Sequence, residues 1–127
     1  MHVIRGSSVQ LQRARREIFT GEVETHTYVD ETLGEHLRLS LVRFKAGART
    51  KWHRHAFEQA LLITEGRGVV ATDAAEHVVE AGDVVVVPAG ERHWHGGTES
   101  TAMAHISITT PGETTVLEPV DRIRSAG

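Results

Sequence analysis

Short stretches of alternating apolar and polar residues recur along most of the chain, with turn residues between them. The segment EVETHTYV at 22–29 alternates, and HLRLSLVRF follows it at 36–44. The same character returns in ALLIT at 60–64, VVAT at 69–72, HVVE at 77–80, VVVVP at 84–88 and TAMAHISITT at 101–110. Alternation with a period of two predicts half-buried strands, and the Gly, Pro and Asp residues between them predict turns.

The connections between these segments predict how the strands are joined. Turns are expected at 46–48, 65–68 and 81–83, and DAAE between 69–72 and 77–80 predicts a hairpin. Residues 10–18 (QLQRARREI) favour at most one short helix. Eight or more short strands at this spacing predict an all-β sandwich or barrel, which can hold a ligand or a metal at one mouth.

The length of 127 residues fits one domain. We expect a charged, solvated N-terminal arm at 1–18, a barrel at 19–118 and a tail at 119–127, of which RIRSAG at 122–127 should be frayed. The single core is large enough to need no disulfide bonds, and the chain has no cysteine with which to form them.

Charge and hydropathy exclude several classes of partner. A net charge of −3 argues against a general nucleic-acid or anionic-membrane binder, because both need a basic surface. No apolar run approaches the ~20 residues of a membrane-spanning helix. The N-terminal sequence lacks the apolar centre of a secretory signal, so we expect a cytoplasmic protein.

The unusual feature of the composition is its nine histidines. On a regular strand the odd-numbered residues after 52 share one face, and Phe57 and Leu61 identify that face as the interior. His53, His55 and Gln59 then point inward as well. Buried polar groups need partners, and a metal ion is the simplest one, since imidazole suits Zn, Fe, Mn, Ni and Cu. The alternative is a set of histidines that hydrogen-bond to carbonyl groups or face water.

Two spaced motifs resemble those of the cupin family. The first is Gly47, His53, His55, Gln59 and Gly66; the second is Gly82, Pro88, Ala89, Gly90 and His93. The resemblance implies a single-domain cupin jelly-roll β-barrel with His53, His55, Gln59 and His93 as metal ligands.

The chain departs from the usual cupin motifs at two positions. Gln59 stands where the first motif usually has glutamate, with Glu58 displaced to the opposite face, and Gly97 replaces the asparagine of the second motif. The implied ligand set is therefore neutral. A divalent ion held by it would keep its full charge, which favours binding an anion or polarising an oxygen or a nitrile. Four ligands around a metal that prefers six leave positions open, as in a catalytic site.

A closer resemblance is to the small manganese-dependent cupin hydroxynitrile lyases. It rests on GARTKWHRH, EQALLIT, GDVVVVPAGERHWHG and TAMAHISI. The resemblance implies a metal-dependent lyase that cleaves or forms cyanohydrins from an aldehyde and HCN. It also implies one divalent ion, Mn(II), with Fe(II), Zn(II), Ni(II) or Co(II) as alternatives.

Further residues are expected around the same site. His95 lies two positions after His93 and so on the same side, and His105 shares a strand face with Thr109. Either His95 or His105 is a candidate catalytic acid or base; the alternatives are a surface His95 and a merely hydrogen-bonded His105. The candidate substrate pocket comprises Ser40, Val42, Thr50, Phe57 and Thr109. Trp52 and Trp94 should face away from the metal and serve packing.

Several functions stay open at this stage, because one fold hosts many activities. The alternatives to the lyase are an Fe(II)-dependent cupin dioxygenase, a cupin-type polyketide cyclase and a non-catalytic small-molecule-binding cupin. The expected partners are a small-molecule substrate and, by resemblance to the family, further copies of the chain in a homodimer or higher homo-oligomer. The N-terminal arm is expected to cross to such a partner.

Overall fold

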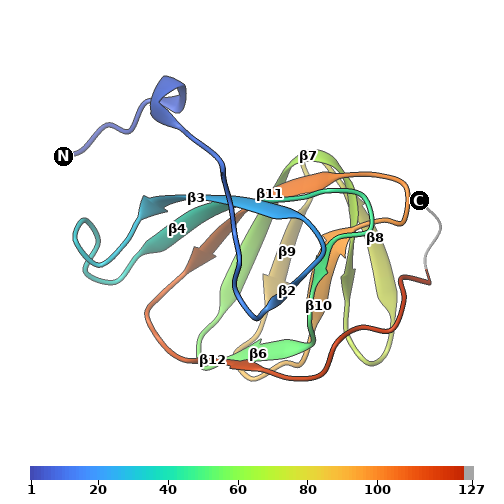
Figure 1. Cartoon of the computed structure of the whole chain (residues 1–127). Helices are drawn as coiled ribbons and strands as arrows, with labels where there is room; N and C mark the ends of the chain where they lie inside the picture. Colours follow the sequence, from blue (N-terminus) through green and yellow to red (C-terminus); the bar gives the residue numbers. More distant parts are fainter. Residues whose placement is uncertain (125–127) are drawn as a thin grey trace.

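The computed structural model describes residues 1–124, and strands dominate it (Figure 1). Its elements are a short 3₁₀ helix η1 (Gly6–Ser8) and the strands β1 (Gln12–Arg13), β2 (Phe19–Thr20), β3 (Val23–Val29), β4 (Arg38–Phe44), β5 (Arg49–Thr50), β6 (His53–His55), β7 (Gln59–Ala71), β8 (Glu76–Glu80), β9 (Val84–Val87), β10 (Trp94–Gly97), β11 (Met103–Thr109) and β12 (Thr114–Val116). The predicted all-β class is confirmed. No described helix is long and apolar enough to span a membrane.

The strands form one sheet that curls round on itself, with β6 and β12 as a separate pair at one end (Figure 1). The hydrogen-bonded order is β1-β3-β4-β11-β7-β10-β5-β2, and β8 and β9 also pair with β7. All pairings are antiparallel among the described strands. The predicted hairpin is confirmed, since β7 and β8 pair with Val70 opposite His77.

Strand β7 is longer than expected, and the turn predicted at 65–68 is wrong. The strand runs unbroken from Gln59 to Ala71 and pairs first with β9 and β11, then with β8 and β10. Gly66 has a φ of +74°, which L side chains rarely adopt, and the pairing with β11 shifts register nearby. Gly66 and Gly68 therefore bend the strand from one side of the barrel to the other without ending it.

The core lies between the curled sides of the sheet. Alternate residues of the central strands fill it, which explains the period-two pattern of the sequence. The larger cluster comprises Val23, Val42, Phe44, Ala48, Leu61, Ile63, Val70, Val79 and Met103. A second cluster comprises Val69, Ala71, Trp94, Val120 and Ile123.

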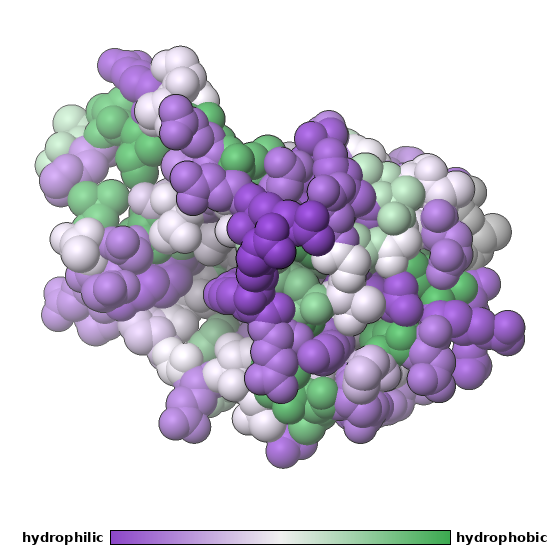
Figure 2. All heavy atoms as spheres, in the orientation of Figure 1, coloured by the Kyte–Doolittle hydropathy of each residue, from purple (hydrophilic) through white to green (hydrophobic). Residues whose placement is uncertain are grey.

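The chain before the barrel is not the short helix expected at 10–18. Gln12 and Arg13 instead form β1, which pairs with Thr25 and Glu24 of β3. The chain then crosses the front of the barrel to β2 (Figure 1), where it appears as a strongly hydrophilic strip (Figure 2). The arginines at 13–16 are compatible with the surface of a helix and with a solvated strand. The pairing of Gln12 and Arg13 with β3 therefore determines that a strand forms here.

The expectation that 122–127 is frayed is wrong for its described part, residues 122–124. Val120 and Ile123 are 7% and 5% exposed and pack in the second cluster. The backbone amide of Arg124 also donates to the carboxylate of Glu76. The described C-terminal residues are therefore part of the packed structure, while 125–127 lie outside the described residues.

We expect Gly66→Ala to destabilise the fold by about 2–3 kcal/mol. A Cβ at this position would collide with the carbonyl oxygen of Ala102 and would also force a left-handed backbone on alanine. Gly47→Ala is the matched control, because Gly47 has a φ of +79° but nothing within 4 Å of its Cβ. Denaturant unfolding in chelator should show a loss of about 1 kcal/mol or less for the control. Equal losses for the two variants would contradict this account of the bend.

Candidate metal centre

Two distant segments of the chain meet at the centre of this site. His53 and His55 occupy alternate positions of β6 and therefore point to the same side. His93, just before β10, forms a bridge with His53, and each backbone N–H donates to the other residue's carbonyl at 2.9 Å. This bridge brings the two histidine motifs into contact, and the ring centroids of His53 and His93 lie 4.2 Å apart.

Hydrogen bonds fix the orientation of the three imidazole rings. The Nδ1 atoms of His53 and His93 lie 2.8 Å from the carbonyl oxygens of Lys51 and Glu91. A carbonyl only accepts, so each Nδ1 carries the proton and each Nε2 keeps its lone pair. The Nδ1 of His55 lies 2.8 Å from the hydroxyl of Thr114. Such outer contacts are those that orient metal-binding histidines.

The free nitrogen atoms of this group suit a cation. One ligand atom from each of His53, His55 and His93 lies within 4.8 Å of the others. The Nε2 of His55 is buried and has no hydrogen-bond partner among the described residues. Gln59 donates from its amide nitrogen to Ser107 at 2.9 Å, which leaves its Oε1 3.3 Å from the Nε2 of His93. Two acceptors that face each other need a cation between them, so the four residues fit a metal ion.

Burial keeps the group uncharged. Desolvation, with the neighbouring His93, lowers the pKa of His53 to about 3. The same causes lower the pKa of His55 to about 4, and desolvation lowers the pKa of His93. Glu58, displaced from the usual ligand position, is exposed. The donor set offered to a metal is therefore neutral.

A second pair of buried histidines adjoins the first group. The Nε2 of His105 lies 3.0 Å from the Nδ1 of His95, and both rings contact Phe44. Desolvation lowers the pKa of His105 to about 3 and, with the neighbouring His105, places that of His95 well below its ordinary value. The Nε2 of His95 and the Nδ1 of His105 have no partner among residues 1–124. One shared proton in the inner hydrogen bond leaves the outer nitrogens available for proton transfer.

A cavity of about 400 Å³ joins the two histidine groups. The expected pocket residues Ser40, Val42, Thr50, Phe57 and Thr109 all line it, together with His53, His55, Gln59, His95 and His105. Phe57 stacks on His55 with centroids 4.7 Å apart, and Thr50 accepts a hydrogen bond from the backbone of His95 at 3.1 Å. The structure thus brings the candidate residues together, while their roles stay predictions.

Sequence reasoning missed one wall of this cavity. Arg16, Glu17, Ile18 and Phe19 line it, as do Ser107, Thr114 and Val116. The first four come from the segment that crosses the front of the barrel, and Arg16 lies over the ring of Phe19 at 5.2 Å. No local sequence pattern places this segment at the mouth, although Ser107 could have been inferred from its alternation with His105 and Thr109.

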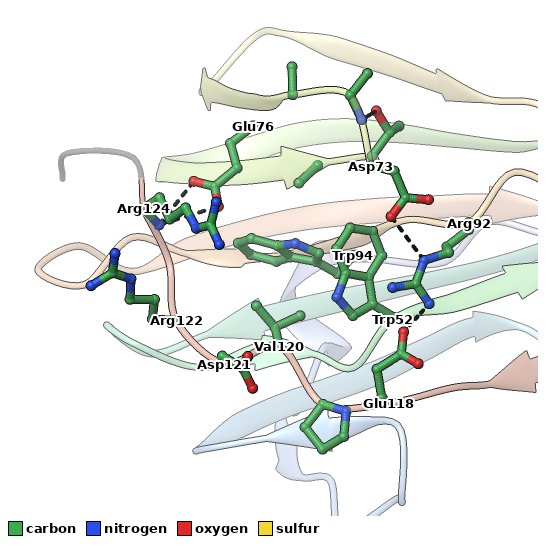
Figure 3. Close-up of a pocket in the computed structure, with 15 residues that line it drawn as sticks. Trp52, Asp73, Glu76, Arg92, Trp94, Glu118, Val120, Asp121, Arg122 and Arg124 are labelled. Carbon is green, nitrogen blue, oxygen red and sulfur yellow. Dashed lines mark hydrogen bonds and ion pairs between the residues drawn. The ribbon is translucent and has the colours of Figure 1, made fainter.

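As expected, neither Trp52 nor Trp94 lines the histidine cavity; both side chains lie together in another hollow (Figure 3). They line a separate hollow of about 880 Å³ against the C-terminal segment. Arg92 stacks on Trp52 at 4.1 Å and pairs with Asp73 at 3.1 Å and with Glu118. Each of the two candidate ligands, His53 and His93, thus follows a residue that takes part in this outer contact.

Comparisons with known proteins agree with this geometry. The family model described as a cupin domain matches residues 40–109. A curated (R)-mandelonitrile lyase from Granulicella tundricola is 44% identical over 68 residues, 53% of this chain and 52% of that protein. The chain thus matches about half the length of this curated relative.

Solved structures share the fold. A cupin-like protein from Thermotoga maritima superposes with a TM-score of 0.79 at 32% identity, over 84% of each chain. The polyketide cyclase RemF from Streptomyces resistomycificus superposes with a TM-score of 0.79 at 16% identity, over 98% of this chain and 88% of that chain. The latter likeness shows the fold alone. The predicted cupin barrel is therefore confirmed.

Removing His93 should abolish tight metal binding. His93→Ala deletes one Nε2 donor, so we expect the affinity for Mn(II) to fall by more than about 100-fold in calorimetric titration of chelator-stripped protein. Thr114→Val, which only removes the partner of His55, should lower it by about 10-fold. His36→Gln, on an exposed side chain, serves as the control. Affinity that survives in His93→Ala would exclude this centre.

Acid should destabilise the metal-free protein. The folded pKa values of His53 and His105, about 3, lie below the ordinary 6.5, so the unfolded chain binds more protons between these values. Stability is complete above pH 6.5 and falls as the pH decreases toward 3. Between these two pKa values, each such histidine lowers the free energy of unfolding by about 1.4 kcal/mol for each unit by which the pH falls.

This slope is measured by denaturant unfolding in chelator between pH 7.5 and pH 5. In the part of this range below pH 6.5, the free energy of unfolding of His105→Leu should fall less steeply with decreasing pH. The difference in slope should approach about 1.4 kcal/mol per pH unit, whatever the absolute stability of the variant. A stability of the parent protein that does not change over this range would contradict the neutral state of the buried histidines.

Proposed function

The chain belongs to the cupin domain family, and we propose that it is a metal-dependent lyase that cleaves and forms cyanohydrins. The similarity over 68 residues to an (R)-mandelonitrile lyase carries the choice of reaction. The substrate would be a small cyanohydrin, and its products an aldehyde and HCN. We further propose Mn(II) as the ion held by His53, His55, Gln59 and His93.

The composition of the cavity supports this reaction. Val42, Phe57 and Phe19 offer apolar contacts for the organic part of a cyanohydrin, and Ser40 and Thr109 offer hydroxyl groups. The volume of about 400 Å³ suits a small molecule with a single ring. When bound, a divalent ion would supply positive charge that offsets the negative charge developing on the substrate's oxygen or on cyanide. The neutral ligands leave that charge undiminished.

Proton transfer falls to the buried histidine pair. The Nε2 of His95 has no partner among residues 1–124 and is available to accept the hydroxyl proton of the cyanohydrin. The C–CN bond then breaks as the C=O bond of the aldehyde forms, and the same nitrogen returns the proton to cyanide. His105, hydrogen-bonded to His95 at 3.0 Å, orients the ring and holds its tautomer. Because burial disfavours the charged imidazolium, His95 has a strong tendency to return the proton.

The experiment is cleavage of mandelonitrile by Mn(II)-loaded protein without oxygen, followed by the absorbance of benzaldehyde. We expect metal-dependent release, and a fall in kcat of about 100-fold or more in His95→Gln, because general base catalysis contributes that much. His95→Gln should still bind Mn(II), since His95 is outside the ligand set. His53→Ala should lose both binding and release.

Two outcomes would count against the lyase. Release at the background rate, with Mn(II) confirmed bound, would exclude the reaction while leaving the metal centre intact. Full activity in His95→Gln would exclude the assigned base. Uptake of oxygen by Fe(II)-loaded protein, measured in parallel, would favour a dioxygenase instead.

A further inference from the structure

Arg92 joins three other parts of the chain (Figure 3). Its guanidinium group stacks on Trp52, with the Cζ atom 4.1 Å from the centroid of the indole ring. Its Nε lies 3.1 Å from the carboxylate of Asp73, in the turn between β7 and β8, and one Nη atom pairs with Glu118, which follows β12. A planar guanidinium with five N–H donors can make all three contacts at once.

The stack of Arg92 on Trp52 lies next to the candidate metal ligands in the sequence. Trp52 immediately precedes His53, and Arg92 immediately precedes His93. In both histidines the Nδ1 atom lies 2.8 Å from the carbonyl oxygen of the residue two positions earlier. Each of these hydrogen bonds therefore spans the residue whose side chain takes part in the stack. The backbone at Trp52 and at Arg92 thus sets the direction of the two imidazole rings.

The C-terminal segment connects to the same place. The backbone N–H of Trp52 donates to the carbonyl of Glu118 at 3.0 Å. Strand β12, shortly before Glu118, pairs with β6, which carries His53. The ion pair between Glu118 and Arg92 therefore connects the strand paired with His53 to the segment that carries His93.

The exposure of these charged side chains argues against a role in stability alone. The side chains of Arg92, Asp73 and Glu118 are 30%, 69% and 58% exposed. Ion pairs that water can reach contribute little to the free energy of unfolding, because solvent screens them and long side chains lose freedom in forming them. Contacts from three directions nevertheless restrict where Arg92, and the backbone that carries it, can lie.

We propose that Arg92 is a positioning residue for the candidate metal centre. Its three contacts hold the segments of His53 and His93 in the arrangement in which their Nε2 atoms can bind one ion. Residues that orient metal ligands from behind typically change the metal affinity by about 10- to 100-fold. The inference rests on the proposed metal centre, and it is independent of the proposed reaction.

The test is calorimetric titration of Mn(II) into chelator-stripped protein. Arg92→Met keeps a long side chain but removes the guanidinium, and we expect the affinity to fall about tenfold. Arg92→Lys should recover part of this loss, because an ammonium group can pair with a carboxylate but cannot stack or bridge two partners as a guanidinium does. Denaturant unfolding in chelator should give nearly the same midpoint for both variants and for the parent chain.

A second set of variants tests whether the two carboxylates act through Arg92. The double variant D73N/E118Q removes both negative charges that pair with the guanidinium, and it should lose affinity to a similar degree. Adding Arg92→Met to this double variant should lower the affinity by only about threefold or less, since side chains that act through one contact are not additive. Independent, multiplying losses would show that the carboxylates and Arg92 act separately, which would overturn the inference.

Arg122→Met is the matched control. Arg122 is exposed and lines the same hollow of about 880 Å³, but it lies outside the contacts between Arg92 and its three partners. Its affinity for Mn(II) should equal that of the parent. Parent-like affinity in Arg92→Met would overturn the inference and leave the metal centre intact, and so would a loss that appears only where the metal-free variant is unfolded. A parent chain that binds no Mn(II) would overturn the metal centre together with this inference.

Discussion

The backbone bridge between His53 and His93 is the contact on which the rest of the site depends. Two N–H···O bonds of 2.9 Å join segments that are forty residues apart in the sequence. Alternation at this bridge turns the two imidazoles toward the buried interior and sends Trp52 and Arg92 outward, where they stack. The C-terminal segment also binds next to this bridge, because the backbone N–H of Trp52 donates to the backbone carbonyl of Glu118 at 3.0 Å. This one strand pairing thus positions the two imidazoles in the interior and the stacked Trp52 and Arg92 on the outer side.

The buried histidines determine both which donor atoms the site provides and how much the site contributes to the stability of the fold. Five imidazoles, at 53, 55, 93, 95 and 105, are buried, and burial lowers the pKa of each. Neutral rings with their free nitrogens turned inward stabilise the fold poorly by themselves, because some of those nitrogens have no hydrogen-bond partner in the described part of the chain. A bound cation would satisfy the first three, and a substrate proton would engage the nitrogen of His95. The arrangement therefore provides nitrogens for binding a cation and transferring a proton, at the expense of the stability of the metal-free fold.

Sequence alone predicts those parts of the structure that follow from alternation. The period of two placed His53, His55 and Gln59 on the interior face, although the strand is interrupted between 55 and 59 and resumes with the same inward residues. The step of two from His93 placed His95 beside the site in the same way. Both inferences need only local geometry. The contact between His95 and His105 depends on the pairing of distant strands, and only the structure establishes it.

The features that the sequence did not predict depend on long-range pairing. Gly66 reads equally well as a turn or as a bend in a continuous strand, and the partners of β7 on both sides decide for the bend. Thr114 stands behind His55 only because β12 pairs with β6 from far along the chain. Arginine-rich residues 13–16 carry no signal that they lead to the cavity mouth. Propensity is a weak guide wherever tertiary contacts choose between such alternatives.

Alternation also connects the two faces of the same strands. On β7 and β11, Leu61 and Ser107 face inward while Leu62 and Ile106 lie on the outside of the sheet. Between the exposed start of the chain and the segment 16–19 that lines the cavity mouth, β1 fixes the chain to β3. This pairing sets where the mouth segment begins, because the backbone N–H of Ala14 also donates to the carbonyl of Val23 at 2.8 Å. The wall of the cavity that no local pattern predicts is therefore positioned by the same kind of antiparallel pairing that forms the barrel.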